Sequence, residues 1–242
     1  MAQEQTETCR ICSNQLTGTY CASCGQPSTL TRINGQYILN EVRHAVNFDK
    51  GFLYSIRELL LRPGLSVRSF IREDRSRLVK PLVFLILTSL FYTLLQQFFH
   101  FEDGYVNYSD STQTTTALLF KWVSNNYGYA NIIMAIFIAL WLKLFFRKYD
   151  YNFFETLILL CFMMGTGMVL YAIFGVLQSF TDYKVLDKGF LIGFLYVCWG
   201  IAQFYDKKKF WNYIKAFFSY LLGFFTFALV IVLLGASIDI IK

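Results

Sequence analysis

The sequence predicts an all-α membrane protein with five transmembrane helices, preceded by a small four-cysteine zinc ribbon and by basic amphipathic helices. Three observations support this prediction. The chain is 55% hydrophobic and only 16% charged, whereas soluble domains carry about 45–50% apolar and about 25% charged residues. Its apolar residues fall into five long runs, and four cysteines stand together near the start. We therefore divide the chain into residues 1–31, 32–80 and 81–242.

The four cysteines form two C-x2-C pairs, Cys9 with Cys12 and Cys21 with Cys24. Zinc prefers four ligands in a tetrahedron, and each pair offers two thiolates from one tight turn. A disulfide framework is disfavoured in a reducing cytoplasm, and a redox pair would need a βαβ context that the sequence lacks. A closed four-cysteine site leaves no position for a substrate, so we predict a structural Zn²⁺ ion bound by these four residues.

The segment 32–80 is basic, and its apolar residues recur at helical spacing. Arg62-Pro63-Gly64 interrupts the pattern and separates two helical pieces. The segment either lies in the membrane interface with its apolar face in lipid or packs against the cytoplasmic ends of the spans. Its cations either serve only to orient the first span or also form a site for lipid head groups or a partner. The candidates for that site are Arg68, Arg72, Arg75 and Arg77.

A helix needs roughly 20 mostly apolar residues to cross a bilayer. The five runs that meet this requirement are 81–99, 130–146, 153–177, 189–205 and 213–238. The segment 114–123 is too short to cross and either lies on the outer surface or forms an ordinary loop. Cys161 and Cys198 lie inside apolar runs, where we expect them to be packing residues.

The distribution of Lys and Arg predicts how the spans are oriented. Basic residues are abundant before the first span, at 147–148 and at 207–209, whereas the intervening loops hold few or balance them with acidic residues. Because short cytoplasmic loops carry an excess of Lys and Arg, we predict a cytoplasmic N-terminus and an external C-terminus.

The first third of the chain carries five short motifs: Tyr20-Cys21-x2-Cys24-Gly25-Gln26, Arg32-Ile33, Asp49-Lys50-Gly51-Phe52, Arg62-Pro63-Gly64 and Lys80-Pro81. Together they resemble an uncharacterised family of bacterial multi-span membrane proteins with an N-terminal zinc ribbon, a domain of unknown function. The likeness covers residues 9 to about 95 well and the later spans only in general character. One departure is the run 73–77, which stands where a Gly-Lys-Arg-like run is expected. The resemblance implies a ribbon followed by spans in a bacterial inner membrane, and it transfers no activity.

The sequence offers little for catalysis, so we predict that the protein is not an enzyme. It holds only two histidines, and it lacks the usual zinc-protease, nucleophile-elbow and phosphate-loop motifs. Charged residues within the apolar runs lie near their ends, which argues against an ion-coupled transporter. Arg10 is the only basic residue in 1–31, so nucleic acid is not an expected partner.

Two functional hypotheses remain. In the first, the ribbon recruits or senses a cytoplasmic protein partner while the spans anchor it in the lipid bilayer. The alternative is a homo-oligomeric channel or membrane-permeabilising effector that is gated through the ribbon.

Overall fold

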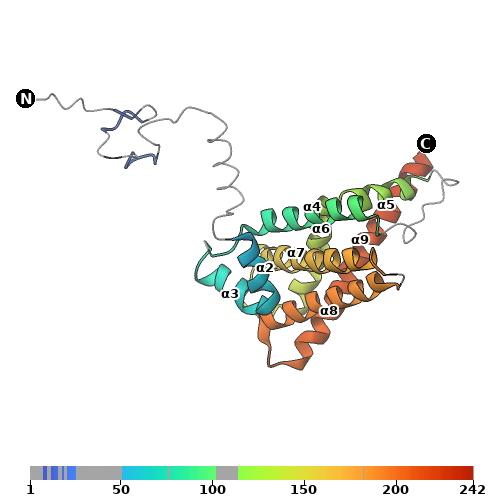
Figure 1. Cartoon of the computed structure of the whole chain (residues 1–242). Helices are drawn as coiled ribbons and strands as arrows, with labels where there is room; N and C mark the ends of the chain where they lie inside the picture. Colours follow the sequence, from blue (N-terminus) through green and yellow to red (C-terminus); the bar gives the residue numbers. More distant parts are fainter. Residues whose placement is uncertain are drawn as a thin grey trace, which may run out of the picture. The chain divides into compact units, whose positions relative to one another are not determined.

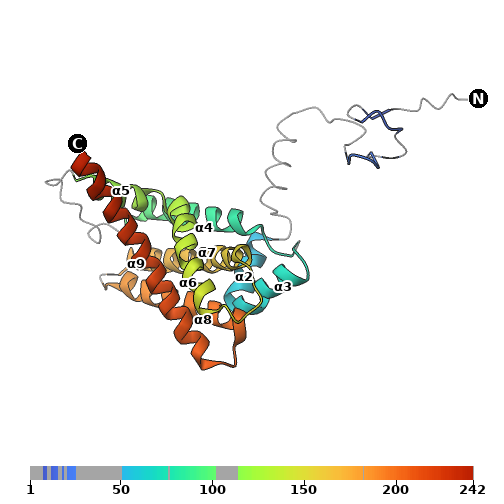
Figure 2. The ribbon, with the colours of Figure 1, turned by 180° about the vertical axis from the view of Figure 1, so that it is seen from behind.

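The structure is a computed structural model that describes residues 8, 9, 12–15, 18, 21–25, 51–75, 77–101, 114–181 and 183–241. The chain divides into two compact units, Met1–Ala45 and Val46–Lys242. The described residues contain eight α-helices and no β-strand, so this part of the chain is all-helical (Figures 1 and 2). The helices are α2 (Phe52–Leu61), α3 (Pro63–Arg72), α4 (Pro81–Phe99), α5 (Thr115–Asn125), α6 (Tyr127–Phe145), α7 (Phe153–Gln178), α8 (Val185–Asp206) and α9 (Phe210–Ile241).

Five of these helices, α4, α6, α7, α8 and α9, are long and apolar enough to cross a membrane. Their mean hydropathy ranges from 1.5 in α8 to 2.6 in α9. Helix α8 begins at Val185, before the predicted start at 189. The reason is a side chain from α7: Gln178 Oε1 accepts hydrogen bonds from the main-chain N–H groups of Val185 and Leu186. Such a cap satisfies donors that the first turn leaves unpaired.

Helix α7 forms the centre of the helical unit and packs against α4, α6 and α8. In its most apolar stretch 67% of the residues are buried, compared with 22% in α9. A helix that is apolar on every side can be covered either by other helices or by lipid, and α7 is covered mainly by other helices. Its start is fixed by a capping box, in which Asn152 and Glu155 bond to each other's main-chain N–H groups.

Glycines allow helices to approach until their backbones touch, as two examples show. A Cβ atom at Gly223 of α9 would lie 2.5 Å from the Cα atom of Ile138 in α6. A Cβ atom at Gly64 of α3 would lie 2.5 Å from the carbonyl carbon of Gln203 in α8. Small residues at such crossings are the usual means by which helices pack closely within membranes.

Helices α2 and α3 are part of this packed unit. Leu59, Val67 and Phe70 belong to the same buried cluster as Phe162 of α7 and Ile201 of α8. The predicted division at 62–64 is confirmed, because α2 ends at Leu61 and α3 begins at Pro63. Of the two placements expected for the segment 32–80, packing against the spans therefore describes its helices α2 and α3. Residues 32–50 lie outside the described residues.

Residues 115–123 belong to a helix, so of the two alternatives for the segment 114–123 the ordinary loop was wrong. Thr114 caps α5 by accepting a hydrogen bond from the main-chain N–H of Ala117. Helix α5 packs against α9. There the carboxylate of Asp239 accepts hydrogen bonds from the main-chain N–H and the hydroxyl of Thr115. This contact between distant parts of the sequence stabilises a helix that is too short to be read from hydropathy alone.

Candidate metal centre and apolar cavity

The four predicted ligands come together in the first unit. The sulfur atoms of Cys9, Cys12, Cys21 and Cys24 all lie within 4.8 Å of one another. Cys9 Sγ lies 3.5 Å from Cys24 Sγ, and Cys12 Sγ lies 3.5 Å from Cys21 Sγ. A tetrahedral zinc site with Zn–S bonds of about 2.3 Å separates its sulfurs by about 3.8 Å. The cluster therefore has the size that one metal ion requires.

The two C-x2-C pairs adopt matching turns. In the first, the main-chain N–H of Ser13 donates to the carbonyl of Cys9 at 2.9 Å; in the second, Gly25 donates to Cys21 at 2.8 Å. Ser13 and Gly25 each follow the last cysteine of their pair and both have positive φ, 59° and 72°. Glycine adopts this conformation without a steric cost, which explains Gly25 physically. The sequence does not reveal that Ser13 adopts the same conformation.

Hydrogen bonds lower the pKa of one of the four thiols, that of Cys21. The main-chain N–H of Cys24 makes the largest contribution to lowering the pKa of the Cys21 thiol, followed by that of Ser23 and then by the thiols of Cys12 and Cys24. A lower pKa favours the thiolate, which is the form of cysteine that binds metal. The geometry and the donors both fit a metal ion held by four cysteines.

The four candidate arginines do not form a single cluster. Arg68 Nη2 donates to the main-chain carbonyls of Gln203 and Phe204, both at 2.8 Å. These carbonyls belong to the last turn of α8, where helix carbonyls lack partners within the helix. Arg68 thus fastens α3 to the end of α8, beside the close contact at Gly64.

The other three arginines lie in different surroundings. The guanidinium of Arg72 lies 4.9 Å from the centre of the Tyr151 ring. Arg77 Nε donates to the Tyr54 hydroxyl at 2.8 Å, and this bond is the main cause that raises the pKa of Arg77. Arg75 is exposed. Arg68 instead lines a cavity of about 390 Å³ together with three other cations, Arg62, Lys207 and Lys208.

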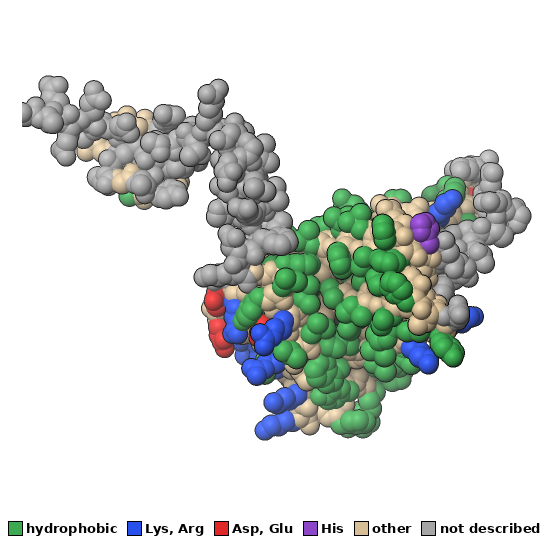
Figure 3. Space-filling view, viewed as in Figure 1, with side chains coloured by type: hydrophobic (Ala, Val, Ile, Leu, Met, Phe, Trp, Pro, Cys, Tyr) green, Lys and Arg blue, Asp and Glu red, His purple; other side chains and the backbone are tan. Residues whose placement is uncertain are grey.

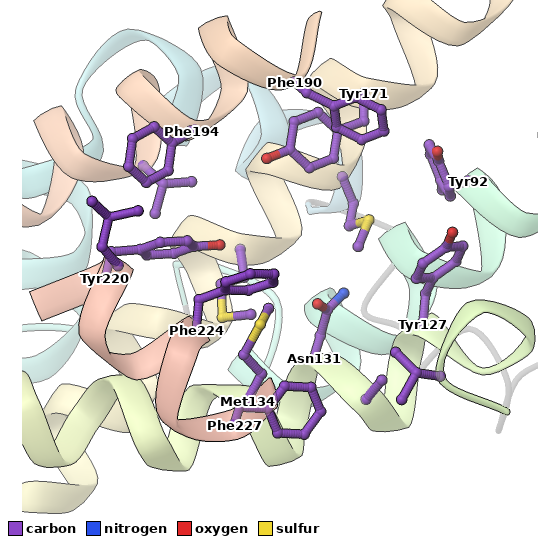
Figure 4. A pocket seen from close by; sticks show the side chains of 17 residues that line it. Tyr92, Tyr127, Asn131, Met134, Tyr171, Phe190, Phe194, Tyr220, Phe224 and Phe227 are labelled. Carbon is purple, nitrogen blue, oxygen red and sulfur yellow. The ribbon is translucent and has the colours of Figure 1, made fainter. Parts of the chain in front are cut away.

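A second cavity, which the sequence did not reveal, lies within the helical unit. It measures about 460 Å³ and is lined by residues of α4, α5, α6, α7, α8 and α9. Figure 4 shows that Tyr, Phe and Met side chains form most of its wall. Asn131 is the one amide among the lining residues, and none of them is charged. The sequence analysis considered only charged groups within the spans, so it predicted no role for this amide near the start of α6.

Part of the chain matches a known family. Residues 49–93 match a family described as protein of unknown function (DUF3667). The matched residues include α2, α3 and most of α4, and thus Gly64 and Arg68 at the contact with α8. No curated protein and no solved structure matches the chain. The match agrees with the expected likeness to an uncharacterised family and brings no activity with it.

Proposed function

We propose that this chain is a non-enzymatic protein of a bacterial inner membrane, whose zinc-loaded ribbon recruits or senses a cytoplasmic protein partner. The observation that carries this proposal is the closed four-sulfur cluster in a compact unit of its own. Four cysteine ligands complete the coordination of zinc, so the ion stabilises a fold and leaves no open position for a substrate. The surface of the ribbon is then the part that a partner can bind.

The distribution of charge supports a cytoplasmic N-terminus. Arg68 contacts the end of α8, Arg72 lies over Tyr151 between α6 and α7, and the Asn212 amide of α9 donates to Tyr149. The basic segments therefore meet at one end of the helical unit, and Figure 3 shows the Lys and Arg side chains that gather over α2 and α3. The described cations of this basic end are Arg57, Arg62, Arg68, Arg72, Arg75, Arg77, Lys80, Lys143, Arg147, Lys148, Lys207, Lys208, Lys209 and Lys215.

The opposite end of the helical unit carries far fewer cations. There Asp239 bonds to Thr115, and the hydroxyl of Ser179 donates to the carbonyl of Phe99. The described cations of this end are Lys121, Lys184 and Lys188. An excess of Lys and Arg marks the cytoplasmic side of a membrane protein. We therefore assign the basic end to the cytoplasm, where its cations also attract anionic lipid head groups.

The lining of the cavity of about 460 Å³ gives no candidate for acid–base catalysis. Its lining contains aromatic and aliphatic side chains, methionines and one amide. General acid–base catalysis needs a group that titrates near the working pH, most often His, Asp or Glu. No such residue lines this cavity.

The test compares cysteines of the ribbon with cysteines of the spans. Wild type, Cys21→Ser and Cys198→Ser are purified from solubilised membranes with their bound proteins, after the expression of each in the membrane is matched. We expect one defined partner to copurify with wild type and Cys198→Ser and to be lost from Cys21→Ser. A partner retained by Cys21→Ser, or none with wild type, would contradict recruitment through the ribbon.

The same strains also test the competing hypothesis of a gated oligomeric pore. A voltage-sensitive dye reports the membrane potential during expression of each variant. Recruitment predicts an unchanged potential in all three strains. A depolarisation that Cys21→Ser alters and Cys198→Ser leaves in place would favour the pore instead.

A further inference from the structure

We propose that the cavity of about 460 Å³ within the helical unit binds a neutral, membrane-soluble molecule through a hydrogen-bond-accepting oxygen, which Asn131 recognises. Cavities that hold small molecules usually measure about 300–1,000 Å³ and combine an apolar wall with a few placed polar groups. This cavity has both properties. The ligand proposed here is independent of the protein partner proposed for the ribbon, so either proposal can fail without the other.

The first argument comes from Asn131 itself. The residue is 4% exposed, and its Nδ2 atom is buried without a hydrogen-bond partner among the described residues. An amide group that is buried without a partner costs free energy, so most buried amides in proteins are paired. In Figure 4 the Asn131 side chain projects from α6 into the space between Tyr127, Tyr171 and Phe224. A ligand oxygen in the cavity would accept the unused hydrogen bond after a turn of the amide about χ2, a torsion with broad minima.

A second buried asparagine shows what a paired amide looks like in the same unit. Asn212 is 3% exposed, and its Nδ2 donates to the Tyr149 hydroxyl at 2.8 Å and to the carbonyl of Asp206 at 3.1 Å. Its role is therefore structural, because it links the start of α9 to two neighbouring turns. Asn131 has a similar burial without these bonds, which points to a function in binding.

The wall of the cavity sets the class of ligand. No charged side chain lines it, so a charged ligand would pay an uncompensated desolvation cost. Aromatic rings such as those of Tyr171 and Phe224 pack well against a flat ring in offset or edge-to-face arrangements. Methionines such as Met134 and Met168 adapt their shape to an irregular apolar body. These features favour a planar carbonyl compound with an apolar tail, while the ester carbonyl of a neutral glycerolipid offers the same hydrogen-bond chemistry.

The ligand can reach the cavity from the bilayer. Phe190 of α8 and Phe224 of α9 both line the cavity and are 38% and 46% exposed. Both residues belong to helices that are apolar enough to span a membrane. Exposed apolar side chains on such helices face lipid, which is where a neutral, tail-bearing molecule is concentrated.

The experiment measures the binding of three neutral probes to the full chain in detergent micelles, by titration and native mass spectrometry. Decylubiquinone has a planar ring with carbonyl oxygens, dioctanoylglycerol has ester carbonyls without a ring, and decylbenzene has a ring and a tail without oxygen. We expect saturable binding of decylubiquinone, about tenfold tighter than that of decylbenzene, because only the quinone completes the hydrogen bond of Asn131. Tighter binding of dioctanoylglycerol than of decylubiquinone would identify a glycerolipid as the source of the carbonyl.

Two variants separate recognition from folding. Asn131→Leu should weaken decylubiquinone binding about tenfold, leave decylbenzene binding unchanged, and leave the melting temperature of the empty protein unchanged or higher, since an unpaired amide is removed. Asn212→Leu should lower the melting temperature without changing the preference for the quinone. Equal affinity of wild type and Asn131→Leu for both oxygen-bearing probes, or no saturable binding of either, would overturn the proposal and leave water as the occupant.

Discussion

The cysteine module, which is the predicted ribbon of residues 1–31, and the helical unit, Val46–Lys242, are stabilised in different ways. Among the described residues of the module only Cys9 and Cys21 are buried, and every other one is exposed. In the helical unit a continuous cluster of apolar side chains is buried, and it extends from Leu59 of α2 to Ala216 of α9. The module therefore depends on four sulfur atoms at one point, whereas the helical unit distributes its stabilisation over many contacts. Loss of a single cysteine should therefore unfold the module, whereas loss of a single core residue should disturb the helical unit only locally.

Size explains the difference. Segments below about 40 residues bury too small a share of their surface to fold alone, and they usually need a metal, disulfides or a partner. The module has few apolar residues but brings four ligands within 4.8 Å. Helix α7 represents the other extreme, because packing on all sides buries most of its residues and needs no added group.

The largest expected effect is the loss of the metal. Cys21→Ser, or treatment of wild type with a strong chelator, should abolish zinc binding and unfold the module, since structural zinc contributes about 10–16 kcal/mol to such sites. Elemental analysis measures the bound zinc, and limited proteolysis within residues 1–45 measures the fold. The helical unit should keep its far-ultraviolet circular dichroism in both cases.

The control for this experiment is Cys198→Ser, which changes a buried cysteine of α8. Zinc content should not change in this variant. A fall in zinc there, or full zinc retention in Cys21→Ser, would mean that the metal is held elsewhere and that the comparison between the two regions is mistaken.

A smaller effect is expected where α3 meets α8. Gly64→Ala places a methyl group 2.5 Å from the backbone of Gln203, and overpacking of this kind typically costs about 1–3 kcal/mol. The melting temperature of the solubilised protein should fall while its zinc content stays the same. In Gly128→Ala the added methyl would meet Ser89 Cβ at 3.6 Å, an ordinary contact, so no fall is expected. Equal melting temperatures for the two variants would show that α3 is not held tightly against α8.

Sequence patterns predicted what depends on local spacing. The apolar runs predicted the five long helices, and the C-x2-C pairs predicted a cluster of four cysteines. The break at Arg62-Pro63-Gly64 predicted the boundary between α2 and α3, because proline ends a helix locally. Each of these signals lies within a short stretch of chain.

Features that join distant parts of the chain could not be predicted in this way. The start of α8 depends on Gln178, and the position of α5 depends on Asp239. Arg68 was expected either to orient the first span or to form part of a site for lipid head groups or a partner, and only the fold shows that it bonds to the end of α8. The cavity around Asn131 is built from six helices, so the sequence showed only an amide in an apolar run.

The smallest effect concerns a glycine of the module, whose role differs from that of Gly64. Gly25 has a φ of 72° and open space around it, so its requirement is conformational and not one of packing. Alanine in this left-handed region costs about 1–2 kcal/mol, which corresponds to zinc binding about five- to thirtyfold weaker. Competition with a zinc-binding dye measures the affinity.

Gly18→Ala is the matched control, because Gly18 also has open space around it but lacks the positive φ. Ser13→Gly is the reverse experiment: it relieves the same conformation in the first turn, where φ is 59°, and should not weaken zinc binding. Equal affinities for Gly25→Ala and Gly18→Ala would mean that the four sulfurs alone determine the module, with no contribution from the turn that presents them.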